Sequence, residues 1–352
     1  MEEISPFQDQ RAKYLECYEN TLKGIMSYPS MFLCNLVSGC AVFNCFYCQY
    51  PENKVKFIDT ETVIRLLYEG KEQLKLKAFE ACSNSGECTT HPHIKEIYKV
   101  AARLGYRLSL ITSGYGIDGE FANLIANNFS YIRFSVDSFD ENISNKIRNP
   151  KVGKASMHSI WSNIQRVVGY KKDIGSDCII GVKCCLTQHN NTLNDIKCYI
   201  TAANELGVNA CAFKRAISPN ITHRDYSDIE QYIKEAQFIY PNMKIFFKNI
   251  EPQRLEGHCW VNPLHLVVDR DGRCCACCYS YAGERNKTHY FGNVHEKSLK
   301  DIWFSPEHWK CIYGINRNLC QLEYQECKCS SINNYCKQAI VDGKLQHEFF
   351  GV

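Results

Sequence analysis

Apolar positions along this chain show two periodicities, which alternate from segment to segment. Short runs rich in branched and aromatic residues have the length of β-strands, and longer segments carry apolar residues at helical spacing. The runs predict strands at 31–37, 76–82, 107–112, 131–136, 178–186 and 210–217. Helical stripes follow them at 63–74, 94–104, 121–125, 157–168, 196–206 and 229–239.

This alternation predicts an α/β fold. Strand–helix units in succession form a parallel sheet with helices outside, and right-handed crossovers curl it into a partial TIM-like (β/α)6 barrel, here over residues 31–250. Residues 1–30 lack a clear period and are interpreted as a short helical lead-in. Residues 251–345 are rich in cysteine and contain a hairpin pattern around Asp271 and Gly272, which predicts a small α+β C-terminal domain.

Composition narrows the class of protein. The 352 residues are 45% hydrophobic and 22% charged, which is ample for a core. A net charge of +3 without a basic block predicts no nucleic-acid partner. The N-terminal segment has no signal-peptide pattern and no long apolar run follows, so we expect a cytoplasmic protein without a membrane anchor. Twenty-two cysteines then indicate metal or iron–sulfur ligation rather than disulfides.

The segment after the first strand, SGCAVFNCFYCQY, concentrates candidate ligands. It holds Cys40, Cys45 and Cys48, with Tyr47 directly before the last of them. Three thiolates can hold three irons of a 4Fe-4S cluster and leave the fourth iron open for chemistry. Considered alone, the same spacing suits a zinc ion equally well.

The pattern resembles the radical S-adenosylmethionine (SAM) superfamily, in which three cysteines carry an aromatic residue before the third. The spacing here is C-x4-C-x2-C, one residue longer in its first gap than the usual pattern. The resemblance implies a 4Fe-4S cluster that binds SAM and cleaves it reductively to a 5'-deoxyadenosyl radical. It also implies a reducing partner such as flavodoxin or ferredoxin.

Chemistry in such barrels lies at the carboxyl ends of the strands, and further family-like residues occur there. Ser85, Gly86 and Glu87 resemble the Gly-Gly-Glu motif that binds the methionine ammonium of SAM, although a plain tight turn fits as well. Ser135 and Asp137 resemble a Ser-x-Asp pattern in which the serine contacts SAM and the aspartate lies near substrate. Asp137 could equally cap the turn that follows.

Two more residues are candidates at this end of the barrel. Arg148 resembles the arginine that pairs with the SAM carboxylate, because a guanidinium suits a planar carboxylate; the alternative is a solvated loop arginine. Cys88 follows Glu87 and is expected to face the barrel mouth, where it could act as a catalytic thiol. The other cysteines in apolar runs are expected to pack as small hydrophobes.

The C-terminal segment resembles a SPASM domain, the auxiliary iron–sulfur extension of many radical SAM enzymes. Its opening is matched by Cys259, twelve residues, Gly272, four residues and Cys277. The continuation, with Cys320, Cys327, Cys329 and Cys336, departs from the usual spacing. The resemblance therefore implies either two auxiliary 4Fe-4S clusters or the single cluster of the shortened twitch form, with a zinc ribbon as the alternative.

Taken together, the resemblance implies an enzyme that abstracts a hydrogen atom from its substrate. The first hypothesis is modification of a peptide or protein, by oxidation or cross-linking. The second is oxidation or rearrangement of a small molecule, such as an amino sugar or alcohol. A zinc-stabilised binding module is the non-enzymatic alternative.

Overall fold

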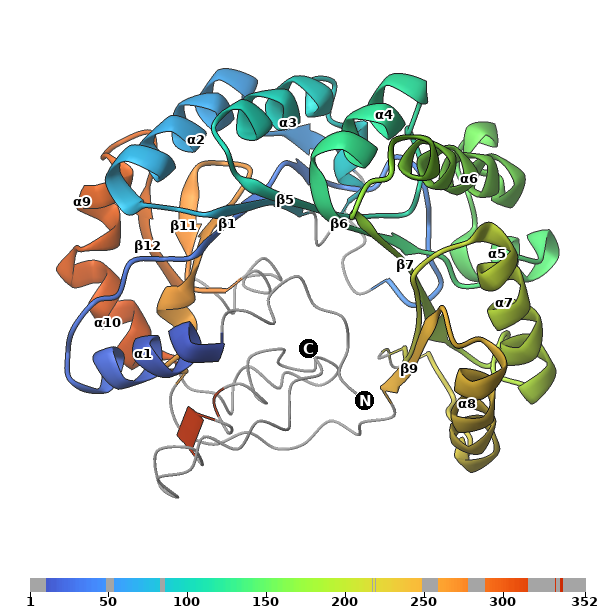
Figure 1. The fold of residues 1–352 in the computed structure, drawn as a ribbon. Coiled ribbons are helices and arrows are strands. Elements are labelled where there is room, and N and C mark those ends of the chain that lie inside the picture. The colour runs from blue at the N-terminus through green and yellow to red at the C-terminus, as the bar shows by residue number, and fades with distance from the viewer. Residues whose placement is uncertain are drawn as a thin grey trace.

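The chain forms a curved sheet with helices along its outer side (Figure 1). The structure is a computed structural model and describes residues 11–48, 54–82, 86–216, 218, 220–248, 259–277, 289–315, 333, 336 and 337. Helices α2, α3, α4, α6, α7 and α8 follow one another around the outer arc, and α1 lies on the opposite, open side of the sheet (Figure 1). Within the described ranges, no helix combines the length and apolar character that a membrane crossing requires.

The elements alternate as the sequence predicts. The strands are β1 (Met31–Asn35), β2 (Val37–Ser38), β3 (Lys56–Phe57), β4 (Ala78–Cys82), β5 (Arg107–Thr112), β6 (Phe129–Ser135), β7 (Ile179–Leu186), β8 (Ala210–Arg215), β9 (Lys244–Lys248), β10 (His265–Val268), β11 (Arg273–Cys275) and β12 (Tyr290–Asn293). The helices are α1 (Arg11–Leu22), α2 (Thr60–Leu74), α3 (Ile94–Arg103), α4 (Gly119–Asn128), α5 (Glu141–Arg148), α6 (Met157–Ile174), α7 (Leu193–Leu206), α8 (Ser227–Ile239), α9 (Leu299–Trp303) and α10 (Pro306–Gly314).

The main sheet has ten strands in the order β12-β11-β10-β1-β4-β5-β6-β7-β8-β9. All six predicted barrel strands are confirmed as β1 and β4 to β8, and their neighbours pair in parallel. The sequence analysis missed β9, which adds a further parallel strand beside β8. Its short pattern, KIFFK, lies between polar segments and does not alternate cleanly, so the run gives a weak strand signal.

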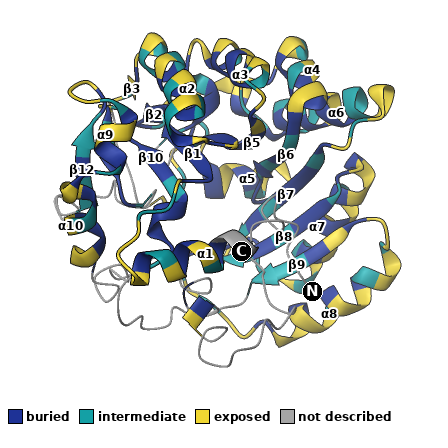
Figure 2. Cartoon of the chain, turned by 60° about the vertical axis from the view of Figure 1, so that its left-hand side comes forward, coloured by how far each residue is buried: buried dark blue, intermediate teal, exposed yellow. Residues whose placement is uncertain are grey.

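Each outer helix is held by a buried stripe and a polar first turn. In α2 the buried positions are Val63, Leu66, Leu67, Gly70 and Leu74, and the same inward-facing pattern recurs around the arc (Figure 2). Side-chain caps begin several helices, because an aspartate, serine or threonine oxygen can accept from an otherwise unpaired backbone N–H. Asp59 does so for α2, Asp140 for α5 and Thr192 for α7.

The C-terminal strands join the barrel rather than forming a sheet of their own. The predicted hairpin is confirmed as β10 and β11, and Gly272 in its turn has the left-handed φ of +80°. However, β10 also pairs in parallel with β1, so the C-terminal strands extend the barrel sheet past its first strand. The lead-in is bound to the same region, since Ser30 N donates to Leu264 O at 2.9 Å and Trp303 Nε1 donates to Ser27 O at 2.9 Å.

Candidate active site

The parallel topology gathers the predicted residues at one edge of the sheet. Cys40 to Cys48 follow β1, Glu87 follows β4, and Ser135 and Asp137 lie at and just beyond the end of β6. The carboxyl ends of neighbouring parallel strands meet at the same edge, so residues far apart in the sequence converge there.

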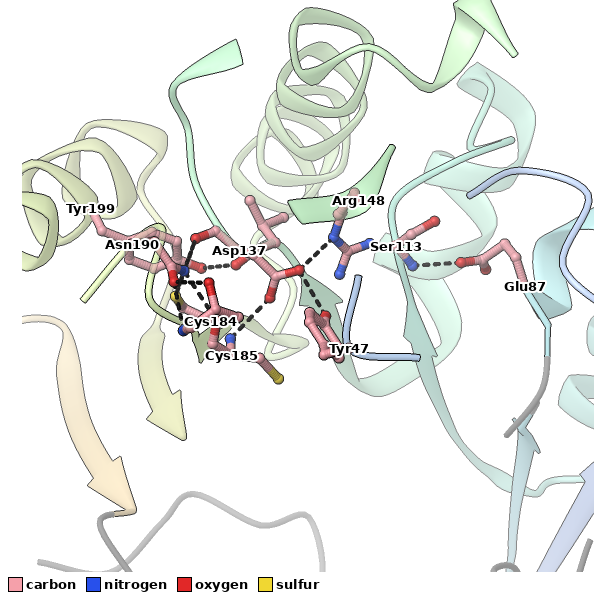
Figure 3. A network of polar contacts seen from close by, with 11 residues as sticks. Tyr47, Glu87, Ser113, Asp137, Arg148, Cys184, Cys185, Asn190 and Tyr199 are labelled. Carbon is pink, nitrogen blue, oxygen red and sulfur yellow. Dashed lines mark hydrogen bonds and ion pairs between the residues drawn. The ribbon is translucent and has the colours of Figure 1, made fainter. Parts of the chain in front are cut away.

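A buried carboxylate, Asp137, is the centre of this edge. Its side chain is 1% exposed, and Oδ2 accepts from the Tyr47 hydroxyl at 2.7 Å and from Arg148 Nε at 2.8 Å (Figure 3). Oδ1 accepts from the backbone N–H of Cys185 at 2.9 Å. A carboxylate is stable in such a place only when it is paired and hydrogen-bonded, and here three donors from three segments supply that.

The backbone beside Asp137 is fixed as firmly as its side chain. Asn190 Nδ2 donates to the Asp137 carbonyl at 2.7 Å and to the Cys185 carbonyl at 3.1 Å. The Tyr199 hydroxyl donates to the carbonyl of Val136 at 2.8 Å. Asn190 lies in the polar run that follows β7. The sequence of that run did not predict that its side chain would hold the Asp137 backbone. The carboxylate is therefore presented from a rigid support.

Charge in this network follows from burial and pairing. Burial is the largest single influence and works against a charged guanidinium, but Asp137, Tyr47 and Cys45 together outweigh it, so the pKa of Arg148 lies above its usual value. Burial raises the pKa of Tyr47, and the neighbouring Asp137 charge raises it further. At neutral pH Tyr47 is therefore a phenol that donates a hydrogen bond, and Arg148 is a cation.

The three-cysteine loop is held against the end of α5. Asn44 N donates to Arg148 O at 3.1 Å, Phe46 N donates to Ile147 O at 2.8 Å, and Phe43 forms a β-bridge with Pro150. The α5 helix was not predicted, because its eight residues are mostly polar. It decides where both Arg148 and the cysteine loop lie.

The three predicted cluster ligands share one neighbourhood. Burial raises the pKa of Cys45 to about 12; Arg148 opposes that rise, while Asp137, Cys48 and Cys40 add to it. The backbone N–H of Phe43 donates to Cys40 Sγ at 3.4 Å. In the described part of the chain, no three His, Cys, Asp or Glu side chains lie close enough to hold a single metal ion. A cubane differs from a single ion because each thiolate binds a different iron.

Glu87 bridges the ends of β4 and β5. Its Oε1 accepts from the Thr112 hydroxyl at 2.7 Å and from the Thr89 hydroxyl at 2.9 Å, and its Oε2 accepts from Ser113 N at 2.7 Å. Gly86 precedes it, while Ser85 lies outside the described residues. Ser135 is half-buried at the end of β6.

Three alternatives from the sequence need correction. Cys88 was expected to face the barrel mouth, but it is 1% exposed in the hydrophobic core and its thiol donates to Ile111 O at 3.5 Å. Asp137 does not cap the turn that follows, because its carboxylate accepts from Tyr47, Arg148 and the backbone of Cys185. Arg148 is not a solvated loop arginine, since it is 5% exposed and paired with Asp137.

The described part of the C-terminal region contains three of the predicted auxiliary ligands. Cys259 and Cys336 are buried, and Cys277 is half-buried. Asn333 accepts from the backbone of Trp260 at 2.8 Å and donates to Cys259 Sγ at 3.3 Å, so it joins the Cys336 segment to Cys259. Cys320, Cys327 and Cys329 lie outside the described residues.

Two family models match separate parts of the chain. The model of the radical SAM superfamily matches residues 34–183, and the model of an iron–sulfur cluster-binding domain, SPASM, matches residues 259–331. The chain belongs to the radical SAM superfamily and carries a SPASM domain. It is therefore an enzyme rather than a zinc-stabilised binding module.

Two curated proteins illustrate how far sequence similarity extends. A tungsten-containing aldehyde ferredoxin oxidoreductase cofactor-modifying protein from Pyrococcus furiosus is 23% identical over 316 residues, which cover 84% of this chain and 85% of that protein. An S-adenosylmethionine-dependent nucleotide dehydratase from Psychrobacter lutiphocae is 46% identical over 69 residues. That match covers 20% of this chain and only 22% of the dehydratase.

Solved radical SAM structures share the fold at low sequence identity. SuiB from Streptococcus suis, bound to the precursor peptide SuiA, aligns with a TM-score of 0.64 at 14% identity and covers 91% of this chain and 76% of its own. The enzyme anSMEcpe with bound AdoMet aligns with a TM-score of 0.57 at 16% identity. The alignment covers 89% of this chain and 96% of the anSMEcpe chain. At this identity the likeness concerns the fold.

Membership of this radical SAM family defines the cofactors. The enzyme uses a 4Fe-4S cluster and SAM, and its SPASM domain implies auxiliary iron–sulfur clusters. The residues at the sheet edge fit this chemistry, since soft thiolates of one loop lie beside a cationic guanidinium and an amide that donates to sulfur. The other donors of the network, Tyr47 and Arg148, converge on a single carboxylate.

Proposed function

We propose that this radical SAM enzyme abstracts a hydrogen atom from a peptide or protein and thereby forms an oxidised residue or a cross-link. The observation that carries the proposal is the extent of the fold shared with SuiB, whose solved complex contains a precursor peptide. A further neighbour, anSMEcpe, has also been solved with both AdoMet and a peptide, and covers 82% of this chain.

Within this proposal the cysteine loop holds the radical cluster through Cys40, Cys45 and Cys48. When bound, the cluster and SAM supply the 5'-deoxyadenosyl radical, and the protein supplies binding and orientation. Reduction would come from a flavodoxin or ferredoxin. Ser85, Gly86, Glu87 and Ser135 are proposed to line the SAM site.

Arg148 is proposed to bind the carboxylate of SAM. Among the described residues, its Nε donates to Asp137, and no side chain or carbonyl there accepts a hydrogen bond from its two terminal nitrogens. A guanidinium held in this way can offer its outer edge to a planar carboxylate. Asp137 is proposed to orient Arg148 and to lie beside the substrate.

The proposal is tested with the reconstituted enzyme under anaerobic conditions, SAM, a reductant and a short peptide encoded beside its gene. We expect 5'-deoxyadenosine to form together with a peptide that has lost two hydrogens, detected by mass spectrometry. If 5'-deoxyadenosine forms but the mass of every such peptide stays unchanged, peptide modification is wrong.

A second candidate is a small-molecule or cofactor substrate. It is favoured by the similarity to the cofactor-modifying protein of Pyrococcus furiosus, which extends over 84% of this chain. The short stretch shared with a nucleotide dehydratase points in the same direction. A nucleotide or sugar that changes mass in the same assay, with no change in any peptide, would establish this candidate.

A further inference from the structure

The cysteine loop borders a hollow in the protein surface. This hollow has a volume of about 420 Å³, and apolar residues from three segments line much of it: Ala41, Val42, Val55, Phe57 and Val152. Phe57 and Val152 are 45% and 36% exposed, although both are apolar. Exposed apolar side chains gathered around a hollow are typical of a surface that binds another molecule.

The threonines and the histidine that line the hollow contact backbone groups of the protein itself. The Thr89 hydroxyl lies 2.6 Å from the Tyr115 carbonyl, and the Thr90 hydroxyl donates to the Glu87 carbonyl at 2.6 Å. The two ring nitrogens of His91 lie 3.0 and 3.2 Å from backbone groups. Because these groups are engaged, the hollow offers mainly apolar contact, which suits a protein surface better than a small polar ligand.

Exposed lysines flank the hollow on two segments of the chain, at Lys54, Lys56, Lys151 and Lys154. Both segments are bound to the cysteine loop. The carbonyl of Lys54 lies so close to Gly39 that a Cβ there would clash with it. Lys151 N donates to Val42 O at 2.8 Å, and Lys151 Nζ donates to Cys40 O at 2.9 Å. The loop is thus bordered by lysines on both segments.

This positive charge is not balanced within the described part of the chain, where no carboxylate forms an ion pair with any of the four lysines. By contrast, Lys95, which also lines the hollow, pairs with Asp118 at 3.0 Å and with Glu120 at 2.5 Å. The sequence has no Asp or Glu from residue 142 to residue 172. Like charges repel each other, and an acidic partner surface would remove that repulsion.

The loop beside this surface is the one proposed to carry the radical cluster. Cys40 and Cys45 are half-buried and Cys48 is exposed, so a cluster held by them lies close to the protein surface. The chemistry needs an electron from a reductant, and electron transfer slows steeply with distance. No member of the Asp137 network lines the hollow, so a partner bound there need not disturb the contacts of Asp137.

We propose that the hollow and its four lysines form the docking surface for a small acidic redox protein that reduces the radical cluster. The inference rests on the proposed function in assigning that cluster to Cys40, Cys45 and Cys48. Apolar side chains of the partner fill the hollow, and its carboxylates pair with the lysines. One electron leaves the reduced cofactor of the partner and enters the cluster, and no bond forms or breaks. Interfaces of this kind are small and depend on charge, so binding is weak and sensitive to salt.

The test compares two triple variants of the full-length reconstituted enzyme in their binding of flavodoxin, measured by biolayer interferometry. The docking variant reverses three lysines that flank the hollow, Lys54→Glu, Lys56→Glu and Lys154→Glu. The matched control reverses three exposed lysines of α6, α8 and β9, Lys172→Glu, Lys234→Glu and Lys244→Glu. We expect association to be about tenfold slower in the docking variant and to lose most of its salt dependence, because electrostatic steering is removed. The control should bind as wild type does.

Cleavage of SAM gives a second measurement. With reduced flavodoxin as the electron source, formation of 5'-deoxyadenosine should be slower in the docking variant than in the control. With dithionite, a small reductant that needs no docking surface, all enzymes should form it at the same rate. An equal loss with dithionite would show damage to the cluster site and would overturn the inference.

Hydrogen exchange of the wild-type enzyme decides the question even if the docking variant fails to fold. Flavodoxin should protect backbone amides at 54–57 and 151–155. Protection confined to other segments, or equal association rates in the two triple variants, would overturn the inference. Protection of these segments by a polyglutamate peptide but not by flavodoxin would assign the surface to an acidic peptide and overturn it as well. None of these measurements uses the substrate, so they are independent of the outcome of the peptide assay.

Discussion

At the scale of single residues, the candidate site depends on one carboxylate that three segments share. Tyr47 belongs to the cysteine loop, Arg148 ends α5, and Cys185 lies on β7, and each donates a hydrogen bond to Asp137. Hydrogen bonds to a charged acceptor are shorter and stronger than neutral ones. The position of the cluster loop relative to the barrel is therefore coupled to these few contacts.

Tyr47→Phe keeps the aromatic ring but removes the hydroxyl that donates to Asp137. We expect the free energy of unfolding to fall by about 1 to 3 kcal/mol, the range for a hydrogen bond to a charged group. Anaerobic urea unfolding of the reconstituted enzyme measures this change. Tyr68→Phe, at a tyrosine that is 46% exposed on α2, is the control and should have no effect. Equal unfolding midpoints for the two variants would contradict the prediction.

His308 on α10 is a second buried residue with a measurable consequence. Its Nδ1 lies 2.7 Å from the Trp303 carbonyl and must donate to it, and its Nε2 is buried without a hydrogen-bond partner among the described residues. Burial lowers the pKa of His308 to about 4, although the bond to Trp303 opposes that shift. Protonation would bury a cation whose Nε2–H has no acceptor among the described residues.

The unfolded chain therefore takes up a proton near pH 6.5, whereas the folded chain resists it down to about pH 4. The stabilising contribution of neutral His308 is complete well above pH 6.5, and it is lost as the pH falls from 6.5 towards 4. Between pH 7.5 and 5.5 we expect His308 to account for a loss of about 1 kcal/mol. His308→Gln should reduce the pH dependence, measured by urea unfolding, while the exposed His158→Gln should leave it unchanged.

At the scale of elements, the end of α5 determines where the cysteine loop lies. Asn149 adopts the left-handed conformation with φ 44° and turns the chain so that residues 147–151 run beside the loop. Glycine lacks the Cβ that crowds the following carbonyl in this conformation, and asparagine offsets the crowding because its short polar side chain can hydrogen-bond locally, whereas alanine has the Cβ without that compensation.

Asn149→Ala should lower the free energy of unfolding by about 1 to 2 kcal/mol, the scale of a left-handed alanine. It should also weaken SAM binding, because the displaced turn carries Arg148 and supports the loop. Calorimetric titration of SAM into the reconstituted enzyme measures the second effect. Asn149→Gly is the matched control and should preserve both properties. Wild-type affinity in Asn149→Ala would show that the turn does not position the site.

At the scale of the whole molecule, the barrel and the C-terminal region form one sheet but are predicted to carry different clusters. Cys45→Ala removes a ligand of the radical cluster and should abolish formation of 5'-deoxyadenosine. Cys277→Ala lies in the SPASM region and should retain cleavage of SAM while product formation stops. Chromatographic assay of 5'-deoxyadenosine and product measures both effects. Normal SAM cleavage by Cys45→Ala would disprove the assignment of the radical site.

The iron content of anaerobically purified enzyme counts the clusters in the whole molecule. About eight irons per chain would indicate one auxiliary cluster and about twelve would indicate two, since each cubane holds four irons. The single-cluster result agrees with the shortened twitch form. About four irons would leave the SPASM domain without a cluster and contradict both forms.

The sequence by itself determined the barrel and the kind of chemistry. Strand and helix periodicity are local properties, so β1, β4 to β8 and the outer helices α2 to α4 and α6 to α8 followed from the pattern of apolar residues. The cysteine loop and the hairpin around Gly272 could also be predicted, because each depends on residues close together in the sequence.

Only the tertiary structure decided which distant residues meet. The pairing of β10 with β1, the salt bridge from Arg148 to Asp137 and the hydrogen bond from Trp303 to Ser27 all join segments far apart in the chain. Such contacts depend on how helices and strands pack, which no local pattern encodes. Burial likewise distinguishes Cys88, a buried core thiol, from the loop cysteines, of which Cys40 and Cys45 are half-buried and Cys48 is exposed. The sequence alone made all of them candidates for chemistry.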